Sequence, residues 1–142
     1  GNEALMLAGS LDTNALVRLI VHDDERQTQV VARLLSKYAN MPESIFVAVT
    51  VILELEWVLR SRYKFSKPDF VTALSSLLMA HEFAFEFEGG LEHALSDYTD
   101  GDADFADYLH LALSRQRKAL PFWTFDTTAA KADGARLLKM SG

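Results

Sequence analysis

Residues 45–62 read IFVAVTVILELEWVLRSR, and this stretch decides the class of fold. Its first part, residues 45–49, is rich in β-branched side chains and predicts a short strand. Thr50 suits a helix cap, and the apolar positions that follow recur at helical spacing up to about Arg62. A strand that leads directly into a helix is half of a βαβ unit, in which the strands run parallel.

The same alternation of short apolar runs and helical patterns continues in both directions along the chain. Further strands are expected at 5–11, 83–87, 121–125 and 136–140, and Gly89 and Gly90 close the run at 83–87. Further helices are expected at 15–21, 28–38, from Pro68 onward, 91–98, 102–116 and 127–132. Strands separated by helices favour a three-layer α/β/α fold with a central, mainly parallel sheet of about 4–5 strands. We expect one domain over residues 1–142.

Composition narrows the possible functions. The 142 residues are 49% hydrophobic and 24% charged, which is typical of a folded globular chain. The absence of cysteine excludes a disulfide scaffold, a thiolate zinc site and a cysteine nucleophile. The net charge of −6 argues against a simple basic nucleic-acid binder, but an enzyme that acts through bound cations stays possible. With no transmembrane stretch and no basic n-region before Gly9, we expect a soluble, cytoplasmic protein.

Two acids follow predicted strands at the place where function collects in α/β folds. Asp12 comes directly after the strand at 5–11, and Asp126 follows the strand at 121–125. If these strands are parallel, both carboxylates leave the sheet at the same edge. Each aspartate also suits the cap of the next helix, and the two roles are compatible.

Glu54 stands out among the acids of the helix at 50–62. It lies at the edge of the apolar stripe, and its neighbours at i+3 and i+4 are Trp57 and Val58, so no cation of its own helix can pair with it. We expect Glu54 on a semi-buried face. A carboxylate there needs a metal ion, or a hydrogen bond from a backbone group or from an arginine elsewhere in the fold.

A third group of acids opens the helix at 102–116. Asp102 is a good N-cap, and Asp104 in the first turn suits the helix dipole. Asp107 lies too far along the helix to be stabilised by the N-cap position or by the helix dipole. It shares a helix face with Asp104 at i, i+3. Two like charges on one face repel, so this pair favours a bound cation.

Four segments together resemble a known family. They are LDTN at 11–14, LEL at 53–55, DFADYL at 104–109 and TFD at 124–126. In this order and spacing they resemble the PIN domain and, more narrowly, the VapC-type toxins of bacterial type II toxin–antitoxin pairs, over about residues 7–140. The resemblance implies a PIN-like fold and carries the family's acidic quartet onto Asp12, Glu54, Asp107 and Asp126. Asp104 matches an additional acid of relatives that share the Asp-Phe-Ala-Asp sequence.

Carboxylates without histidine or cysteine partners select hard cations, here Mg²⁺ or Mn²⁺. The resemblance implies an endoribonuclease that hydrolyses RNA phosphodiester bonds with metal-activated water, through one ion or two. Asp12 and Asp107 are expected as direct ligands, and Glu54, Asp104 and Asp126 as the acids that complete or orient the set. Polar neighbours that could orient these ligands are Thr13, Asn14 and Thr124.

The resemblance also implies a cognate antitoxin and a homodimer. Two apolar helical stripes, within 30–38 and 70–78, are suited to such interfaces, although both could instead pack on the sheet. Trp57 and Trp123 are expected in the core or at an interface. We expect no membrane partner.

One basic and aromatic cluster is a possible RNA contact. Arg60, Arg62 and Lys64 alternate with Tyr63 and Phe65, an arrangement that can bind phosphates and stack a base. Cations near the C-terminal dipole of a solvated helix explain the same pattern.

Two other functions remain open. A haloacid-dehalogenase-like phosphatase would use Asp12 as its nucleophile, but that reaction needs a second aspartate two residues later, where Asn14 stands. A catalytically idle module with this fold would only bind a partner. A metal titration separates an idle module from an enzyme.

Overall fold

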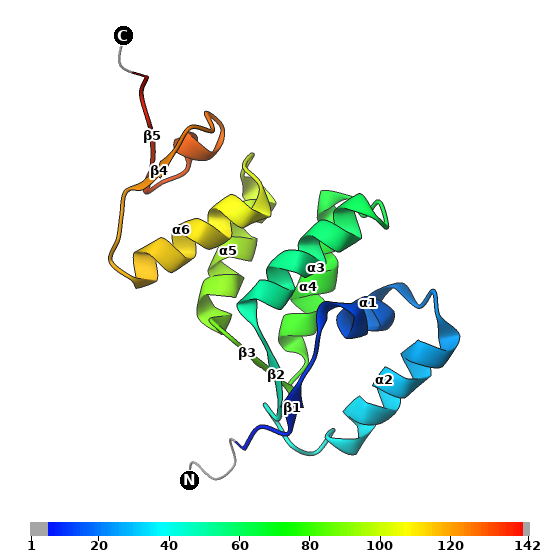
Figure 1. Cartoon of the computed structure of the whole chain (residues 1–142). Helices are drawn as coiled ribbons and strands as arrows, with labels where there is room; N and C mark the ends of the chain where they lie inside the picture. Colours follow the sequence, from blue (N-terminus) through cyan, green and yellow to red (C-terminus); the bar gives the residue numbers. More distant parts are fainter. Residues whose placement is uncertain (1–5, 141–142) are drawn as a thin grey trace. The chain divides into compact units, whose positions relative to one another are not determined.

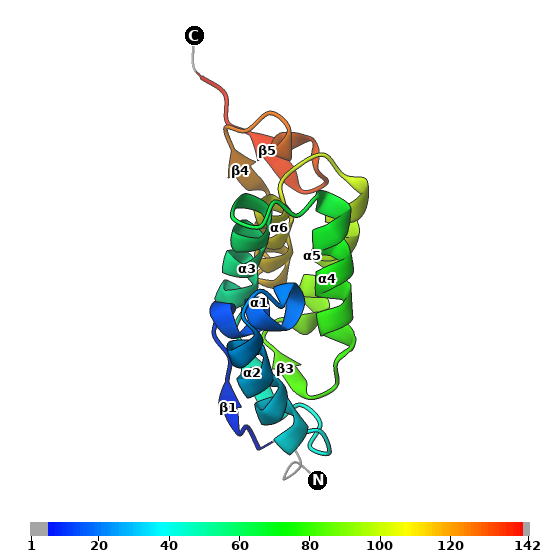
Figure 2. The same cartoon turned by 90° about the vertical axis from the view of Figure 1, so that its right-hand side faces the viewer.

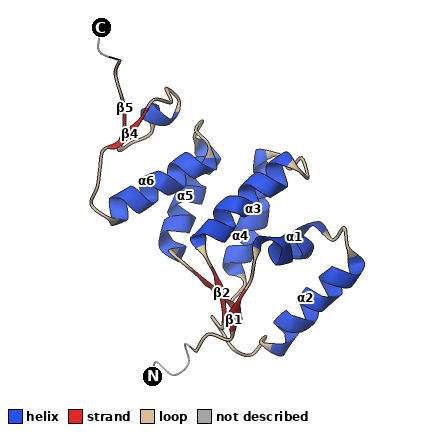
Figure 3. Ribbon diagram, viewed as in Figure 1, coloured by secondary structure: helices blue, strands red, loops and turns tan. Residues whose placement is uncertain are grey.

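A computed structural model describes residues 6–140, and these divide into two compact units, 6–88 and 89–140. Each unit is described by itself. Helices account for most of both, and the strands are short (Figures 1 and 3). None of the helices in the described part of the chain is long and apolar enough to span a bilayer.

The first unit is built on a parallel sheet. Its elements in chain order are β1 (Gly9–Ser10), α1 (Thr13–Val21), α2 (Glu25–Lys37), β2 (Ile45–Val47), α3 (Val49–Ser61), α4 (Lys67–Met79) and β3 (Phe83–Phe85). The strand order is β1-β2-β3, with Gly9 opposite Ile45 and Ile45 opposite Phe83. Helix α1 packs against α2 and α3, and α3 packs against α4 (Figure 2).

The core of the first unit comes from the apolar faces of these elements. Val47 of the central strand is fully buried, and so are side chains from α1, α3 and α4: Leu16, Val17, Ile52, Leu55, Leu59, Phe70 and Leu74. The apolar run on α4 therefore packs inward. On α2 only Val31 is buried, whereas Val30 is 62% exposed and Leu34 is 39% exposed.

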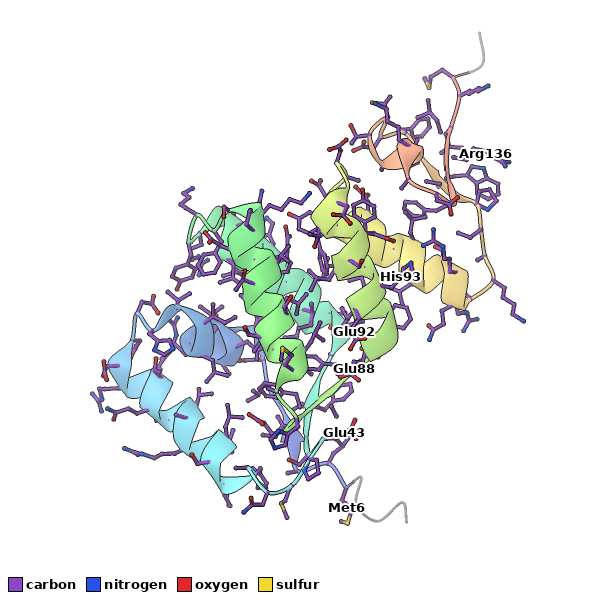
Figure 4. All side chains as sticks on the ribbon, turned by 180° about the vertical axis from the view of Figure 1, so that it is seen from behind. Met6, Glu43, Glu88, Glu92, His93 and Arg136 are labelled. Atoms are coloured by element: carbon purple, nitrogen blue, oxygen red, sulfur yellow. The ribbon has the colours of Figure 1, made fainter. Side chains whose placement is uncertain are left out.

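The second unit carries the remaining elements. They are α5 (Glu88–Asp100), which begins on the last residue of the first unit, α6 (Phe105–Gln116), β4 (Phe122–Thr124), the 3-10 helix η2 (Ala129–Lys131) and β5 (Ala135–Leu137). Strands β4 and β5 pair in parallel, with Trp123 opposite Arg136. Figure 4 shows Arg136 on β5 and His93 on α5. The α/β class and the parallel strand direction are confirmed, and the five strands of the described residues form two sheets.

Aromatic packing fixes the turn between α5 and α6. The ring of Tyr98 meets that of Phe105 edge-on, with centroids 5.7 Å apart. The Tyr108 hydroxyl accepts a hydrogen bond from the Ala103 amide at 3.3 Å. A Cβ on Gly101 would lie 1.8 Å from that hydroxyl oxygen, so only glycine fits this turn.

Several predicted boundaries were wrong for local reasons. The strand expected at 5–11 comprises only Gly9–Ser10 among the described residues, and both are exposed because β1 is an edge strand; Leu5 lies outside the described residues. The predicted third strand ends at Phe85, because Phe87 adopts a left-handed φ of 60°, and Gly89 and Gly90 belong to α5.

Two predicted helix caps were also wrong. Thr50 lies inside α3, whose N-cap is Ala48. Asp102 lies before α6, whose N-cap is Asp104, so Asp104 is not in the first turn. By contrast, the prediction that a helix begins around Pro68 is confirmed, since Ser66 and Asp69 form a capping box there.

Candidate functional site

Asp12 begins the candidate site in the first unit. It is the N-cap of α1, and its Oδ1 accepts a hydrogen bond from the Ala15 amide at 2.9 Å. The residue is exposed at the carboxyl end of β1. The cap uses Oδ1, so the aspartate caps its helix and still presents a carboxylate to solvent.

Glu54 is joined to this position by a side-chain hydrogen bond. The hydroxyl of Thr13, a buried residue, donates to Glu54 Oε1 and thereby links the first turn of α1 to α3. The semi-buried placement expected for Glu54 was wrong, because this carboxylate is exposed. Its hydrogen-bond partner is a threonine 41 positions earlier in the chain. Asn14, the next residue of α1, is exposed.

Glu86 is an acid of this edge that sequence reasoning missed. It directly follows β3, and its Oε1 accepts a hydrogen bond from the Val49 amide, the first of α3, at 2.8 Å. The signal in the sequence was Ala48: an alanine N-cap leaves the first amides of a helix without a side-chain acceptor. The cap thus comes from a neighbouring strand.

Asp107 is an acid of the second unit whose pKa is shifted by its surroundings. It lies in the first turn of α6, half-buried. Burial raises the pKa of Asp107 above its usual value, and the negative charges of Asp104 and Asp126 raise it further. A hydrogen bond to the Asp104 backbone and the nearby His110 act in the opposite direction. The second unit therefore brings three acids within electrostatic reach of one another.

Asp126 occupies a tight turn after β4. Its Oδ1 accepts hydrogen bonds from the amides of Thr128 at 2.8 Å and Ala129 at 2.9 Å, and it thereby caps η2. Its own amide donates to Thr124 Oγ1 at 3.0 Å. Thr124 therefore fixes the backbone that carries this exposed carboxylate.

The predicted site residues fall into two groups. The first unit holds Asp12, Thr13, Asn14 and Glu54, and the second holds Asp104, Asp107, Thr124 and Asp126. Within the described residues of either unit, no three His, Asp or Glu side chains gather at metal-ligand spacing. The acids and threonines of both groups offer carboxylate and hydroxyl oxygens, and Asn14 adds an amide oxygen; oxygen atoms are the donors that hard divalent cations prefer.

The tryptophans and the basic cluster lie at or near the surface of their units. Trp57 on α3 is 62% exposed and Trp123 on β4 is 59% exposed, so the core alternative was wrong for both, and an interface role stays a prediction. Arg62 and Lys64 are exposed just beyond the end of α3, while Arg60 is half-buried on its last turn.

The sequence that contains these residues matches the model of a known protein family. The family model described as the PIN domain matches residues 10–135. The chain belongs to the PIN domain family. The matched part of this PIN domain includes every predicted site residue and runs through both units.

This PIN domain is also similar to a solved structure of a toxin. It is the Mycobacterium tuberculosis toxin VapC20, described as cleaving the sarcin-ricin loop, with 18% sequence identity and a TM-score of 0.40. The match covers 89% of this chain and 96% of that chain. No curated protein matches the sequence.

Proposed function

We propose that this PIN domain is an endoribonuclease that depends on Mg²⁺ or Mn²⁺ and acts as the toxin of a type II toxin–antitoxin pair. The observation that carries the proposal is the family match, which includes all five acids expected to hold the metal ion. We propose that the chain forms a single PIN domain, because the family match runs from residue 10 to residue 135. Its site of action is the cytoplasm.

The donor set fits a hard divalent cation. In the second unit, the charges of Asp104 and Asp126 oppose ionisation of Asp107, a local excess of negative charge that a cation relieves. We assign Asp12 and Asp107 as the direct ligands, with Glu54, Asp104 and Asp126 completing or orienting the set. A bound Mg²⁺ or Mn²⁺ supplies charge neutralisation at the phosphodiester and a lower pKa for an attacking water.

The chain's own hydrogen bonds hold these acids in place. Thr13 restrains the Glu54 carboxylate through its hydroxyl, and Thr124 fixes the turn that carries Asp126. Asn14, exposed beside Thr13, supplies a further polar group. Residues that orient ligands in this way commonly change metal affinity or activity about 10–100-fold when they are replaced. Backbone phosphates of the RNA are assigned to Arg60, Arg62 and Lys64.

A cleavage assay tests the proposal. Single-stranded RNA is incubated with the wild type in Mg²⁺, in Mn²⁺ and in chelator, and with the variants Asp12→Asn and Asp107→Asn. We expect cleavage only with metal, and a loss of about 100-fold or more in each variant. The matched control is Glu92→Gln, which removes one exposed charge on α5 (Figure 4). Full activity in chelator, or in both aspartate variants, contradicts the mechanism.

Thermal unfolding gives a second readout that needs no substrate. A cation that binds the folded state raises the melting temperature by linkage, and a concentration a hundred times the Kd adds about 2.7 kcal/mol. We expect millimolar Mg²⁺ or Mn²⁺ to stabilise the wild type and Glu92→Gln, but not Asp12→Asn or Asp107→Asn. An idle module would show no such rise, and a phosphatase would hydrolyse a phosphate monoester and leave RNA intact.

We also assign the protein two protein partners, a second copy of itself and an antitoxin. The antitoxin would inhibit by inserting an arginine or lysine among the carboxylates, where its charge replaces that of the metal. Co-expression with the product of the adjacent gene tests this assignment. A product that neither copurifies with the protein nor relieves its toxicity is not the antitoxin.

A further inference from the structure

One exposed face of α3 connects an acid of the site to the basic end of the helix. Glu54, Trp57 and Ser61 follow at i, i+3 and i+7, so they lie above one another along the helix over about 10 Å. All three are exposed, and Trp57 is 62% exposed. A large aromatic ring thus stands in solvent one helical turn from Glu54.

Beyond this face the chain turns through a strongly basic segment. Residues 60–67 contain four cations and no acid, in a chain whose net charge is −6. Lys64 adopts a left-handed φ of 59°, and the Phe65 amide bonds to the Leu59 carbonyl at 2.9 Å. These features shape the backbone of the turn that carries the exposed Arg62 and Lys64 at the end of α3.

The two aromatic residues inside the basic turn, Tyr63 and Phe65, already contact other parts of the first unit. The Tyr63 hydroxyl donates to Asp23 Oδ2 at 2.9 Å, and the other oxygen of that carboxylate pairs with Arg18. Tyr63 and Phe65 are both half-buried. The sequence pattern favoured these two rings for base stacking, whereas the structure leaves Trp57 as the exposed ring on this part of the unit.

We propose that Trp57 stacks on a base of single-stranded RNA while Arg62 and Lys64 bind the adjacent phosphates, so that the exposed face of α3 directs the strand toward Glu54. The inference rests on the proposed ribonuclease function and names how its substrate is held. An exposed ring beside the exposed cations Arg62 and Lys64 matches the two features every nucleotide offers, a flat base and a phosphate. Stacking accepts any base, so this contact selects unpaired RNA without reading its sequence.

The chain offers a direct spectroscopic test, because Trp57 and Trp123 are its only tryptophans. In the variant Trp123→Phe, Trp57 is the sole indole. Titration with a short oligouridylate, in chelator so that no cleavage occurs, should quench its fluorescence to saturation. Trp57→Ala in the wild-type background should bind the same RNA about five- to a hundredfold more weakly. Trp57→Phe should retain most of the affinity, and Trp123→Ala, which removes an equally exposed ring from β4, should leave it unchanged.

The salt dependence of binding tests the phosphate contacts. Removing one phosphate contact lowers the slope of log affinity against log salt by about 0.7 for single strands. We expect this change in Arg62→Gln and in Lys64→Gln, and none in Arg33→Gln, an exposed cation on α2. Circular dichroism establishes that each variant is folded.

Three results of the binding experiment would overturn the inference: no quenching, equal weakening by Trp57→Ala and Trp123→Ala, or a fluorescence change that follows protein concentration without RNA. The last result would indicate self-association through Trp57. Failure of the proposed function is distinguishable, because binding is measured without metal. Quenching by RNA in a protein that never cleaves it refutes the ribonuclease and leaves the stacking contact standing. Metal-dependent cleavage that is unaffected by Trp57→Ala refutes the contact alone.

Discussion

The hydroxyl of Thr13 is the smallest feature on which the candidate site depends. It is the group that restrains the Glu54 carboxylate, and it lies next to Asp12 in the chain. Replacement by valine keeps the size and the β-branch but removes the donor. We expect Thr13→Val to lower RNA cleavage about 10–100-fold with the fold intact, and Thr13→Ser to restore most of it. Equal activity in the two variants would show that packing, not the hydrogen bond, matters at this position.

Asp107 makes the free protein sensitive to pH. Its pKa is raised in the folded state by burial and by the charges of Asp104 and Asp126, so over the window between its unfolded and its folded pKa the folded state holds the proton more often. Stability from this group is therefore present below the unfolded pKa and falls as the pH rises through that window. In chelator at pH 7, Asp107→Asn should raise the melting temperature by about 1–4 °C, since the residue is partly solvated. At pH 3.5 the difference should shrink; a gain of the same size at both pH values would contradict this origin.

Among the elements, α3 depends on a cap from another part of the chain. Glu86 accepts the Val49 amide, and the local N-cap Ala48 offers no side-chain acceptor. We expect Glu86→Ala to reduce the free energy of unfolding by about 1 kcal/mol in a urea titration. Ala48→Asp should restore most of that loss, because the extended backbone at this position suits a local cap. If Ala48→Asp raises the free energy of unfolding by the same amount in the wild type and in Glu86→Ala, the two carboxylates do not serve the same amides.

The elements also show what could be read from the sequence. The start of α4 was predicted from Pro68, and the capping box that the structure adds there joins Ser66 to Asp69, only three positions apart. The bonds that define the candidate site join residues far apart in the chain, Thr13 to Glu54 and Glu86 to Val49, and no local pattern encodes them. Asp12 and Asp126 were predictable because each follows a strand, and Asp104 and Asp107 because they open a helix. Their partners were not, since those depend on which strands become neighbours.

At the scale of the whole molecule, α2 leaves an apolar stripe in solvent. Val30 is 62% exposed and Leu34 39% exposed, whereas the comparable run on α4 is packed. We expect the protein to be a dimer in light scattering at high micromolar concentration, and Val30→Asp to shift it toward the monomer without unfolding it. The matched control is Met79→Asp, which alters an 84% exposed side chain on α4. A wild type that is monomeric throughout would refute self-pairing.

The cap on α3 has a consequence for the order in which the protein is made. Val49 leaves the ribosome 37 residues before the glutamate that bonds to its amide. At about 5–20 residues per second, the first turn of α3 waits roughly 2–7 s for its acceptor. During that interval Thr13 and Glu54 have both been synthesised, but the helix that carries Glu54 has an open end. The nascent chain therefore completes the edge that holds Asp12 and Glu54 only after β3 has emerged.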